Sequence, residues 1–210
     1  MSVVLRDEIE LLNLMRLVFR GNLKGDKMGF LNFFGKGSDE KKGLVAIGKA
    51  ISADDKVVTA EIEKCVKDTE TYFEENEERF EERGMEPEDL EDDAEEVRWI
   101  ALVDILEVNG YVCERDWKDD LEEFVHFVGN LKGTKSRGLL IDSEWFDEDG
   151  DVAEWCKVLD EKWADKGICV AAIDIESDSY VLFPYEVEKL DKLCELAESL
   201  ERRIDMAKNV

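Results

Sequence analysis

A helix-length run at residues 97–110, apolar on nearly every side, is the feature that most constrains this fold. Its sequence reads VRWIALVDILEVNG. A surface helix keeps one polar face, whereas a helix that is apolar all round has to be buried. The run closes with Asn109 and Gly110, a pair typical of a helix C-terminus. We therefore expect a central helix that is buried against a sheet.

Segments rich in β-branched residues predict that sheet. Residues 167–175 read GICVAAIDI, which favours a buried strand. Residues 177–179 predict a turn, after which residues 180–184 return as the partner strand. Two shorter strands are predicted at 111–114 and 139–142. The longer pair indicates antiparallel pairing.

Apolar residues at three- and four-residue spacing predict helices around the sheet. Asp119 and Asp120 each precede a glutamate by three residues, which predicts a capping box at the start of one helix. Asp54 and Asp55 are candidate caps for another helix that begins near Lys56. The predicted helices span residues 3–20, 44–83, 119–129, 151–166 and 186–207.

The order of these elements indicates an α+β fold: a mostly antiparallel small sheet packed against helices, with a helical N-terminal extension. Large aromatic residues support a substantial core. Trp99, Trp155 and Trp163 fit the apolar faces of their helices and are predicted to be buried.

Changes in composition along the chain suggest three parts. Residues 1–43 combine the N-terminal helix with a Gly/Lys-rich segment, which we interpret as flexible. Residues 44–96 are predicted as a helical segment that ends in an acidic linker. Residues 74–96 carry fourteen acidic and two basic residues, and Gly84 and Pro87 interrupt them, so we predict a solvated helix end followed by a mobile acidic linker. Residues 97–210 form the predicted α+β domain.

The net charge narrows the possible partners. The chain carries 54 acidic and 28 basic residues, a formal net charge of −26. Such a chain repels nucleic acid phosphates and anionic lipid, so we expect no nucleic acid and no membrane as partners. A bilayer-spanning helix needs about 20 apolar residues, which we do not find. We also find no secretory signal, and five cysteines without a Cys-x-x-Cys pair indicate reduced thiols. We therefore expect a cytoplasmic protein.

The spacing of glycine and acidic residues in this chain differs from that of common cofactor-binding motifs. The glycines at 29 and 35 are separated by five residues, one more than a phosphate-binding loop allows. The acidic turn at 147–151 places its glycine wrongly for a calcium loop and is interpreted as a helix cap. His126 is the single histidine and has no catalytic partner pattern. We therefore assign no catalytic residue, no cofactor and no metal ligand.

One loop stands out as a candidate contact surface. Trp117 lies between Asp116 and Lys118, in the connection from a predicted strand to a predicted helix. Loops that are held by rigid elements often carry function. An aromatic residue at such a position is a candidate for partner or ligand contact.

Three strings in the C-terminal part also resemble a known kind of domain. They are WIALVDILEVNGYV at 99–112, DWK at 116–118 and the later residues Asp174, Asp178 and Tyr180. Together they are similar to a bacterial domain family of unknown function over roughly residues 97–200. The resemblance implies the fold and no activity. It extends the candidate partner or ligand surface, which comprises Asp116, Trp117, Lys118, Asp178 and Tyr180.

We favour a non-enzymatic, acidic interaction protein that binds a basic protein partner through 74–96 or 142–151. Bacterial immunity proteins, which neutralise toxins, are similar in kind. One alternative is a hydrolase or small-ligand enzyme that uses a divalent metal, for which hard oxygen ligands are suited. Another is a nucleic-acid mimic, which needs carboxylates at phosphate-like spacing along one face. The candidate ligands for the metal enzyme are Asp142, Glu144, Asp174 and Asp178.

Overall fold

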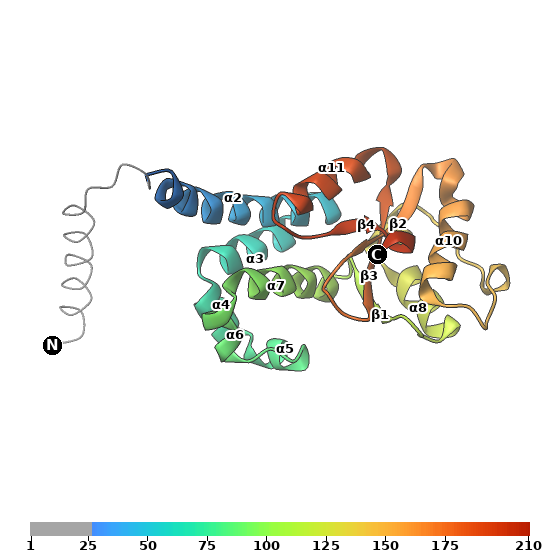
Figure 1. Ribbon diagram of the computed structural model, residues 1–210. Coiled ribbons are helices and arrows are strands. Elements are labelled where there is room, and N and C mark those ends of the chain that lie inside the picture. Colours follow the sequence, from blue (N-terminus) through green and yellow to red (C-terminus); the bar gives the residue numbers. More distant parts are fainter. Residues whose placement is uncertain (1–26) are drawn as a thin grey trace, which may run out of the picture. The chain divides into compact units, whose positions relative to one another are not determined.

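The computed structural model describes residues 27–210, with side chains from residue 39 onward (Figure 1). The predicted helix at 3–20 lies outside the described residues. Residues 40–210 group into one unit. Within the described part, no helix combines the length and the apolar character needed to cross a bilayer.

The sheet has four antiparallel strands in the order β1-β3-β2-β4. The predicted strand pair is confirmed, because β2 and β3 pair along the whole length of β2. Together with the surrounding helices, this sheet confirms the α+β fold. The strands are β1 (Cys113–Asp116), β2 (Ile168–Ile173), β3 (Ser179–Glu186) and β4 (Ile204–Met206).

Both faces of the sheet are covered, which explains why every residue of β2 is buried. Successive side chains of a strand point to opposite faces. Cys169, Ala171 and Ile173 belong to the core cluster that includes the central helix, whereas Val170 and Ala172 belong to the cluster that includes Trp155 and Trp163. Helix pairs such as α3 and α7 cover one face, and α8 and α10 cover the other (Figure 1).

Among residues 27–210, six helices on the side of the first layer precede the sheet in the chain, and α11 (Val187–Glu198) joins this layer after β3. The predicted central helix is confirmed as α7, which is buried along most of its length and is followed by Asn109 as its C-cap. Asp55 caps α3, as predicted, and accepts hydrogen bonds from the backbone N–H groups of Val57 and Val58. The helices that precede the sheet are α2 (Lys27–Ile51), α3 (Lys56–Lys67), α4 (Thr69–Glu75), α5 (Glu77–Glu82), α6 (Pro87–Asp92) and α7 (Ala94–Val108).

The interpretation of the Gly/Lys-rich segment as flexible is wrong from residue 27 onward, because α2 begins there. Two glycines of α2 allow close helix packing. A Cβ atom added at Gly43 would lie 2.7 Å from Leu200 Cδ2, and one added at Gly48 would overlap Ile62 Cδ1. These glycines therefore serve contact between elements, a role that the sequence does not distinguish from flexibility.

The helix end predicted up to residue 83 is confirmed by α4 and α5, whereas the acidic linker predicted after it is wrong, since that part folds into α6 and the start of α7. Apolar side chains anchor the whole segment, residues 74–96. Phe80 is buried and stacks on Phe73 with ring centroids 4.4 Å apart, and Met85 is buried as well. Gly84, with φ of 72°, separates α5 from α6. The high charge of this segment belongs to an ordered surface.

The second layer contains the elements from α8 to η2. Two predictions for this part of the chain are wrong. The stretch predicted as a strand at 139–142 forms no strand and leads into the short helix η1. The predicted capping box does not form at α8, because Asp119 accepts a bond from Arg115 Nη1 at 3.2 Å and Asp120 makes no side-chain cap bond. The elements are α8 (Leu121–Asn130), α9 (Lys132–Ser136), η1 (Ser143–Trp145), α10 (Val152–Trp163) and η2 (Ala164–Lys166).

The last predicted helix is too long. Helix α11 spans Val187–Glu198, after which Glu201 adopts a positive φ of 59° and the chain turns back. Residues 204–206 then pair with β2 as the edge strand β4, and the short helix η3 (Ala207–Asn209) follows. Three residues are too few for a reliable alternation pattern, so β4 depends on its neighbour β2.

The three tryptophans predicted as core residues are buried, which confirms that prediction. A buried indole N–H needs a hydrogen-bond acceptor. Trp99 donates to the Asp174 carbonyl at 2.9 Å, Trp155 to the Asp147 carbonyl at 2.8 Å, and Trp163 to the Leu140 carbonyl at 2.9 Å. Each bond ties a helix to a loop.

Candidate functional site

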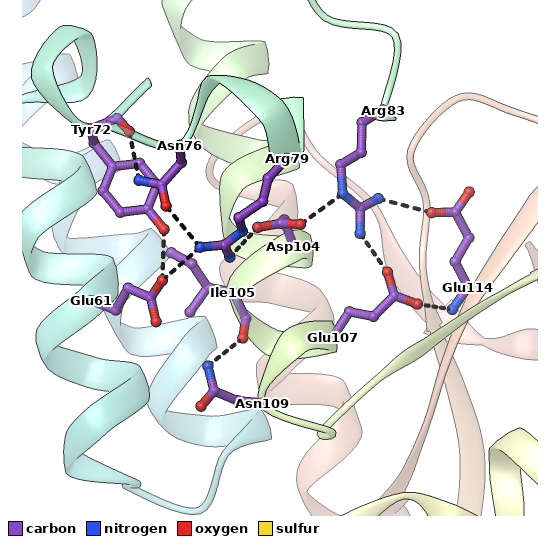
Figure 2. A network of polar contacts seen from close by, with 10 residues as sticks. All are labelled: Glu61, Tyr72, Asn76, Arg79, Arg83, Asp104, Ile105, Glu107, Asn109 and Glu114. Carbon is purple, nitrogen blue, oxygen red and sulfur yellow. Dashed lines mark hydrogen bonds and ion pairs between the residues drawn. The ribbon is translucent and has the colours of Figure 1, made fainter. Parts of the chain in front are cut away.

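A buried carboxylate on the central helix organises the polar contacts beneath the acidic segment, residues 74–96 (Figure 2). Asp104 is 7% exposed and lies between two arginines of that segment. Arg83 Nε donates to Asp104 Oδ1 at 3.1 Å, and Arg79 Nη2 forms an ion pair with Asp104 Oδ2. Burial of an unpaired carboxylate costs several kcal/mol, and the two arginines offset that cost for Asp104.

Arg83 continues the network to the sheet. Its Nη2 donates to Glu107 at 2.5 Å and its Nη1 donates to Glu114 at 2.9 Å. Burial by itself lowers the pKa of this guanidinium, but the bond to Asp104 and the other carboxylates outweigh burial and raise it overall. Arg83 therefore joins the acidic segment to α7 and β1.

Arg79 connects the same segment to α3. Its Nη1 donates to Glu61 at 3.2 Å and to Asn76 at 3.0 Å. The Tyr72 hydroxyl donates to the same Glu61 oxygen at 2.8 Å (Figure 2). Burial and this bond raise the pKa of Tyr72, so its hydroxyl remains protonated and serves as a donor.

The network determines which charged side chains of the acidic segment are paired. Arg79 and Arg83 are the basic residues of the acidic segment, and both pair with carboxylates on other elements. Among residues 39–210, whose side chains the structure describes, two carboxylates of the segment form ion pairs: Glu75 with Lys64, and Glu96 with Arg202. The other twelve of its fourteen carboxylates have no ion pair there. The outward surface of this segment is therefore strongly negative.

A groove of about 600 Å³ lies in this surface. Its floor is apolar and includes Phe73 of α4, Leu90 of α6 and Ala94 at the start of α7. The uncharged residues Pro87 and Thr69 also line the groove. We call it the acidic groove, because its charged lining consists of Glu70, Glu74, Glu77 and Glu91.

Two of these four glutamates, Glu74 and Glu91, are placed where helices do not favour them, whereas Glu70 and Glu77 lie in the first turns of α4 and α5. Glu70 and Glu74 are like charges four residues apart on α4. Glu74 and Glu91 lie in the last turns of α4 and α6, next to the negative ends of the helix dipoles, and neither turn contains a basic residue. In the described part of the chain, no cation pairs with any of the four. The groove thus combines an apolar floor with uncompensated negative charge.

The structure brings the sequence-predicted surface residues together at the end of β1. The backbone N–H of Trp117 donates to the Asp178 carbonyl at 3.2 Å, and the backbone N–H of Lys118 donates to Asp116 Oδ1 at 2.8 Å. Lys118 Nζ lies 4.2 Å from the centre of the Trp117 ring. Trp117 is 43% exposed, so an aromatic surface is held there by rigid neighbours.

Tyr180 lies beside this cluster but is partly covered. It sits on β3 opposite Arg115 of β1, one position from the Asp116–Ser179 pair. Burial, followed by the charge of Asp151, raises the pKa of Tyr180. The candidate surface is therefore a compact group of neighbours, with Trp117 as its exposed centre.

Two of the four carboxylates considered for a metal enzyme, Asp142 and Asp174, accept local backbone hydrogen bonds. Asp142 accepts from the Glu144 N–H at 3.1 Å, and Asp174 accepts from the Glu176 N–H at 2.8 Å. Within residues 27–210, no three histidine, cysteine, aspartate or glutamate side chains form a group that could hold a metal ion. His126 is exposed, with Nε2 3.2 Å from Asn130 Nδ2.

The cysteines are unpaired thiols, and four of the five are buried. Burial raises the pKa of Cys65, Cys113 and Cys169 to about 12 in each case. Because the thiolate is the nucleophilic form, these side chains are unreactive at neutral pH. They act as small apolar core residues.

Sequence reasoning located the acidic segment but missed the acidic groove. The sequence contains one usable signal: Glu70, Glu74 and Glu77 recur at helical spacing around Phe73. That spacing places Glu70 and Glu74 beside Phe73 on α4, and Glu77 follows at the start of α5. The remaining parts of the lining, Leu90 and Ala94, are brought there by the chain reversal at Gly84.

Comparison with known proteins gives one family and no characterised relative. The family model described as "Domain of unknown function (DUF6630)" matches residues 44–207. This match begins well before residue 97, so it includes the helices that carry the acidic groove. No curated protein and no solved structure shows a significant match.

Proposed function

Because the chain belongs to the DUF6630 family, a domain of unknown function, we propose its role from its surface: it is a non-enzymatic interaction protein that binds a basic protein partner. The binding site in this proposal is the acidic groove. The protein acts in the cytoplasm, in the manner of an immunity protein or inhibitor that covers a basic surface of its partner.

The observation that supports this proposal is the placement of unpaired charge around an apolar floor. The acidic segment directs both of its arginines inward, and among the side chains of residues 39–210 no cation pairs with the groove glutamates. Natural sequences usually avoid such local conflicts unless a function requires them. A bound Lys- or Arg-rich surface removes the conflict.

Electrostatic steering gives the proposal its expected salt dependence. Attraction between exposed charges decays over a Debye length of about 8 Å at physiological salt and about 3 Å at 1 M salt. Complementary charge mainly raises the association rate. Binding of the partner is therefore expected to be fast at low salt and to weaken as salt increases.

The test compares two variants that lose the same charge. The groove variant carries Gln at positions 70, 74, 77 and 91. The charge-matched control carries Gln at four exposed glutamates of α10 and α11 that form no ion pair within residues 27–210: Glu161, Glu188, Glu195 and Glu198. Wild type and both variants are immobilised and exposed to extract of the native host.

We expect wild type and the control to retain the same basic proteins, and the groove variant to lose them. Raising the salt to about 1 M should release them from wild type, because screening then acts within 3 Å. Equal retention by the groove variant and the control would contradict binding at the acidic groove. Retention that is insensitive to salt would contradict recognition of a basic surface.

A further inference from the structure

We infer that the acidic groove receives an amphipathic, cationic helix of the partner protein. Apolar side chains of that helix contact the floor at Leu90 and Ala94, and its Lys or Arg side chains face the groove glutamates. This inference rests on the proposed function and specifies its partner: a polybasic tail without apolar residues is excluded as the natural ligand.

The apolar floor argues for an amphipathic ligand. Leu90 and Ala94 are partly exposed in the groove, and Pro87 is exposed. A volume of about 600 Å³ is within the range of roughly 300–1,000 Å³ that accommodates bound groups. A tail of lysines alone would neutralise the glutamates but leave this floor uncovered. Apolar side chains of a ligand gain free energy by covering it.

The backbone of the groove argues for a helical ligand. The lining residues come from helices α4, α5, α6 and α7, so none of them belongs to a strand of the sheet. An extended ligand needs the free edge of a strand to satisfy its backbone groups, whereas a helix satisfies its own. Helix-in-groove binding is therefore the recognition mode that this site can offer.

The spacing of the glutamates fits a ligand helix that follows α4 and the start of α5, because Glu70 and Glu74 lie on α4 and Glu77 is the first residue of α5. Glu70, Glu74 and Glu77 repeat at four and three residues. Lys or Arg residues at three- and four-residue spacing occupy one side of a helix and can face such a row. Glu91 contributes a further carboxylate from α6.

The test uses three synthetic peptides of equal length and equal positive charge. The first contains Leu and Lys arranged to give one apolar helix face. The second has the same composition in an order that gives no apolar face. The third replaces every Leu by Ser. Affinities are measured by fluorescence anisotropy for wild type and for variants of the full chain.

Two groove variants change shape without changing charge. Ala94→Phe fills the groove, and Leu90→Ala removes part of its floor. The matched control is Ala153→Phe, because Ala153 is also a partly buried alanine in the first turn of a helix, α10. Urea unfolding of each variant shows whether it is folded before its affinity is compared.

We expect wild type to bind the amphipathic peptide at least about tenfold more tightly than its reordered isomer, a ratio that burial of about two methylene groups provides. Ala94→Phe should abolish this preference, Leu90→Ala should reduce it, and Ala153→Phe should leave it unchanged. If wild type binds both isomers equally, or if Ala94→Phe and Leu90→Ala both keep the preference, the inference is overturned.

The same peptides separate this inference from the proposed function. If the groove variant with four Gln loses affinity for all three peptides while the shape variants behave as wild type, the proposed function stands and the amphipathic helix is wrong. If the groove variant binds all three peptides as the charge-matched control does, the acidic groove is not the binding site and both proposals fail.

Discussion

Arg83 Nε lies 3.1 Å from Asp104 Oδ1, and the two side chains are 14% and 10% exposed. This pair connects the acidic segment to the central helix. Because Arg83 also contacts Glu107 and Glu114, one side chain satisfies three carboxylates from two elements. The pair therefore links the fold of the acidic segment to the fold of the sheet.

Arg83→Ala should destabilise the protein by about 2–3 kcal/mol, just below the cost of breaking a fully buried pair, since Arg83 keeps some exposure. Arg83→Lys keeps the charge but loses the planar fork, so its effect should be smaller but measurable. Urea unfolding at neutral pH measures both. A loss below about 0.5 kcal/mol for Arg83→Ala, the range of ordinary surface substitutions, would contradict this role.

Glu74→Gln should stabilise the protein by roughly 0.5–1 kcal/mol at low salt, because it removes a like-charge pair with Glu70 and a negative charge from the last turn of α4. Glu188→Gln is the matched control with the opposite sign, since Glu188 lies in the first turn of α11, where a negative charge is favourable. Urea midpoints of both variants are compared with wild type.

The difference in urea midpoint between each of these variants and wild type should nearly vanish at about 1 M salt, where screening shortens the Debye length to about 3 Å. Gain of stability at Glu74 together with loss of partner binding would be the signature of a functional charge. If Glu74→Gln lowers stability at low salt, the groove glutamates are not in conflict with their helices.

Tyr111→Phe should change how stability depends on pH. The Tyr111 hydroxyl donates to Asp55 Oδ2 at 2.7 Å. This bond is the largest contribution that lowers the pKa of Asp55, while burial and the same bond raise the pKa of Tyr111 to about 12. Asp55 therefore stabilises the fold above its unfolded pKa of 3.8, and that contribution is lost as pH falls through its lower folded value.

The stabilising contribution of Tyr111 depends on pH in the opposite direction. Its contribution is fully present below its unfolded pKa of 10.0 and is lost as pH rises towards 12. Urea midpoints measured across pH should show Tyr111→Phe less stable than wild type near neutrality, with the two proteins converging as pH falls through the lowered pKa of Asp55 and as it rises towards 12. A constant difference across this range would show that the bond does not perturb either group.

Gly48→Ala and Gly129→Ala should act in opposite directions although both glycines lie in helices. Alanine is better than glycine in a helix by roughly 1 kcal/mol. A Cβ at Gly129 meets Ile141 Cδ1 at an ordinary 3.9 Å, so Gly129→Ala should stabilise. A Cβ at Gly48 overlaps Ile62, so Gly48→Ala should destabilise, and Ile62→Val in the same chain should restore part of the loss. Equal gains for both alanines would contradict the close packing of α2.

The sequence predicts elements well where a local pattern is strong. The apolar run that becomes α7 and the β-branched run that becomes β2 are long and unambiguous, and Asp55 and Asp151 act as caps because capping is a local interaction. The turn before Tyr180 is equally local. These elements determine the α+β class.

Elements that depend on distant contacts were missed. Arg83 reaches Asp104, Glu107 and Glu114, which lie 21 to 31 residues away in the chain, so the acidic segment reads as a linker when its charges are counted locally. Strand β4 exists because β2 offers an edge. The acidic groove likewise depends on the reversal that brings Leu90 towards Phe73.

The same network occupies a backbone N–H group at the outer edge of β1. The Glu114 N–H would be free to pair with a strand from another chain, but it donates to Glu107 Oε1 at 2.8 Å, and Glu107 is itself held by Arg83. A strand that approached at this point would have to displace a charged, bonded side chain. The network that orders the acidic segment thus also protects the sheet against edge-to-edge association, so that a loss of Arg83 exposes the protein to aggregation as well as to unfolding.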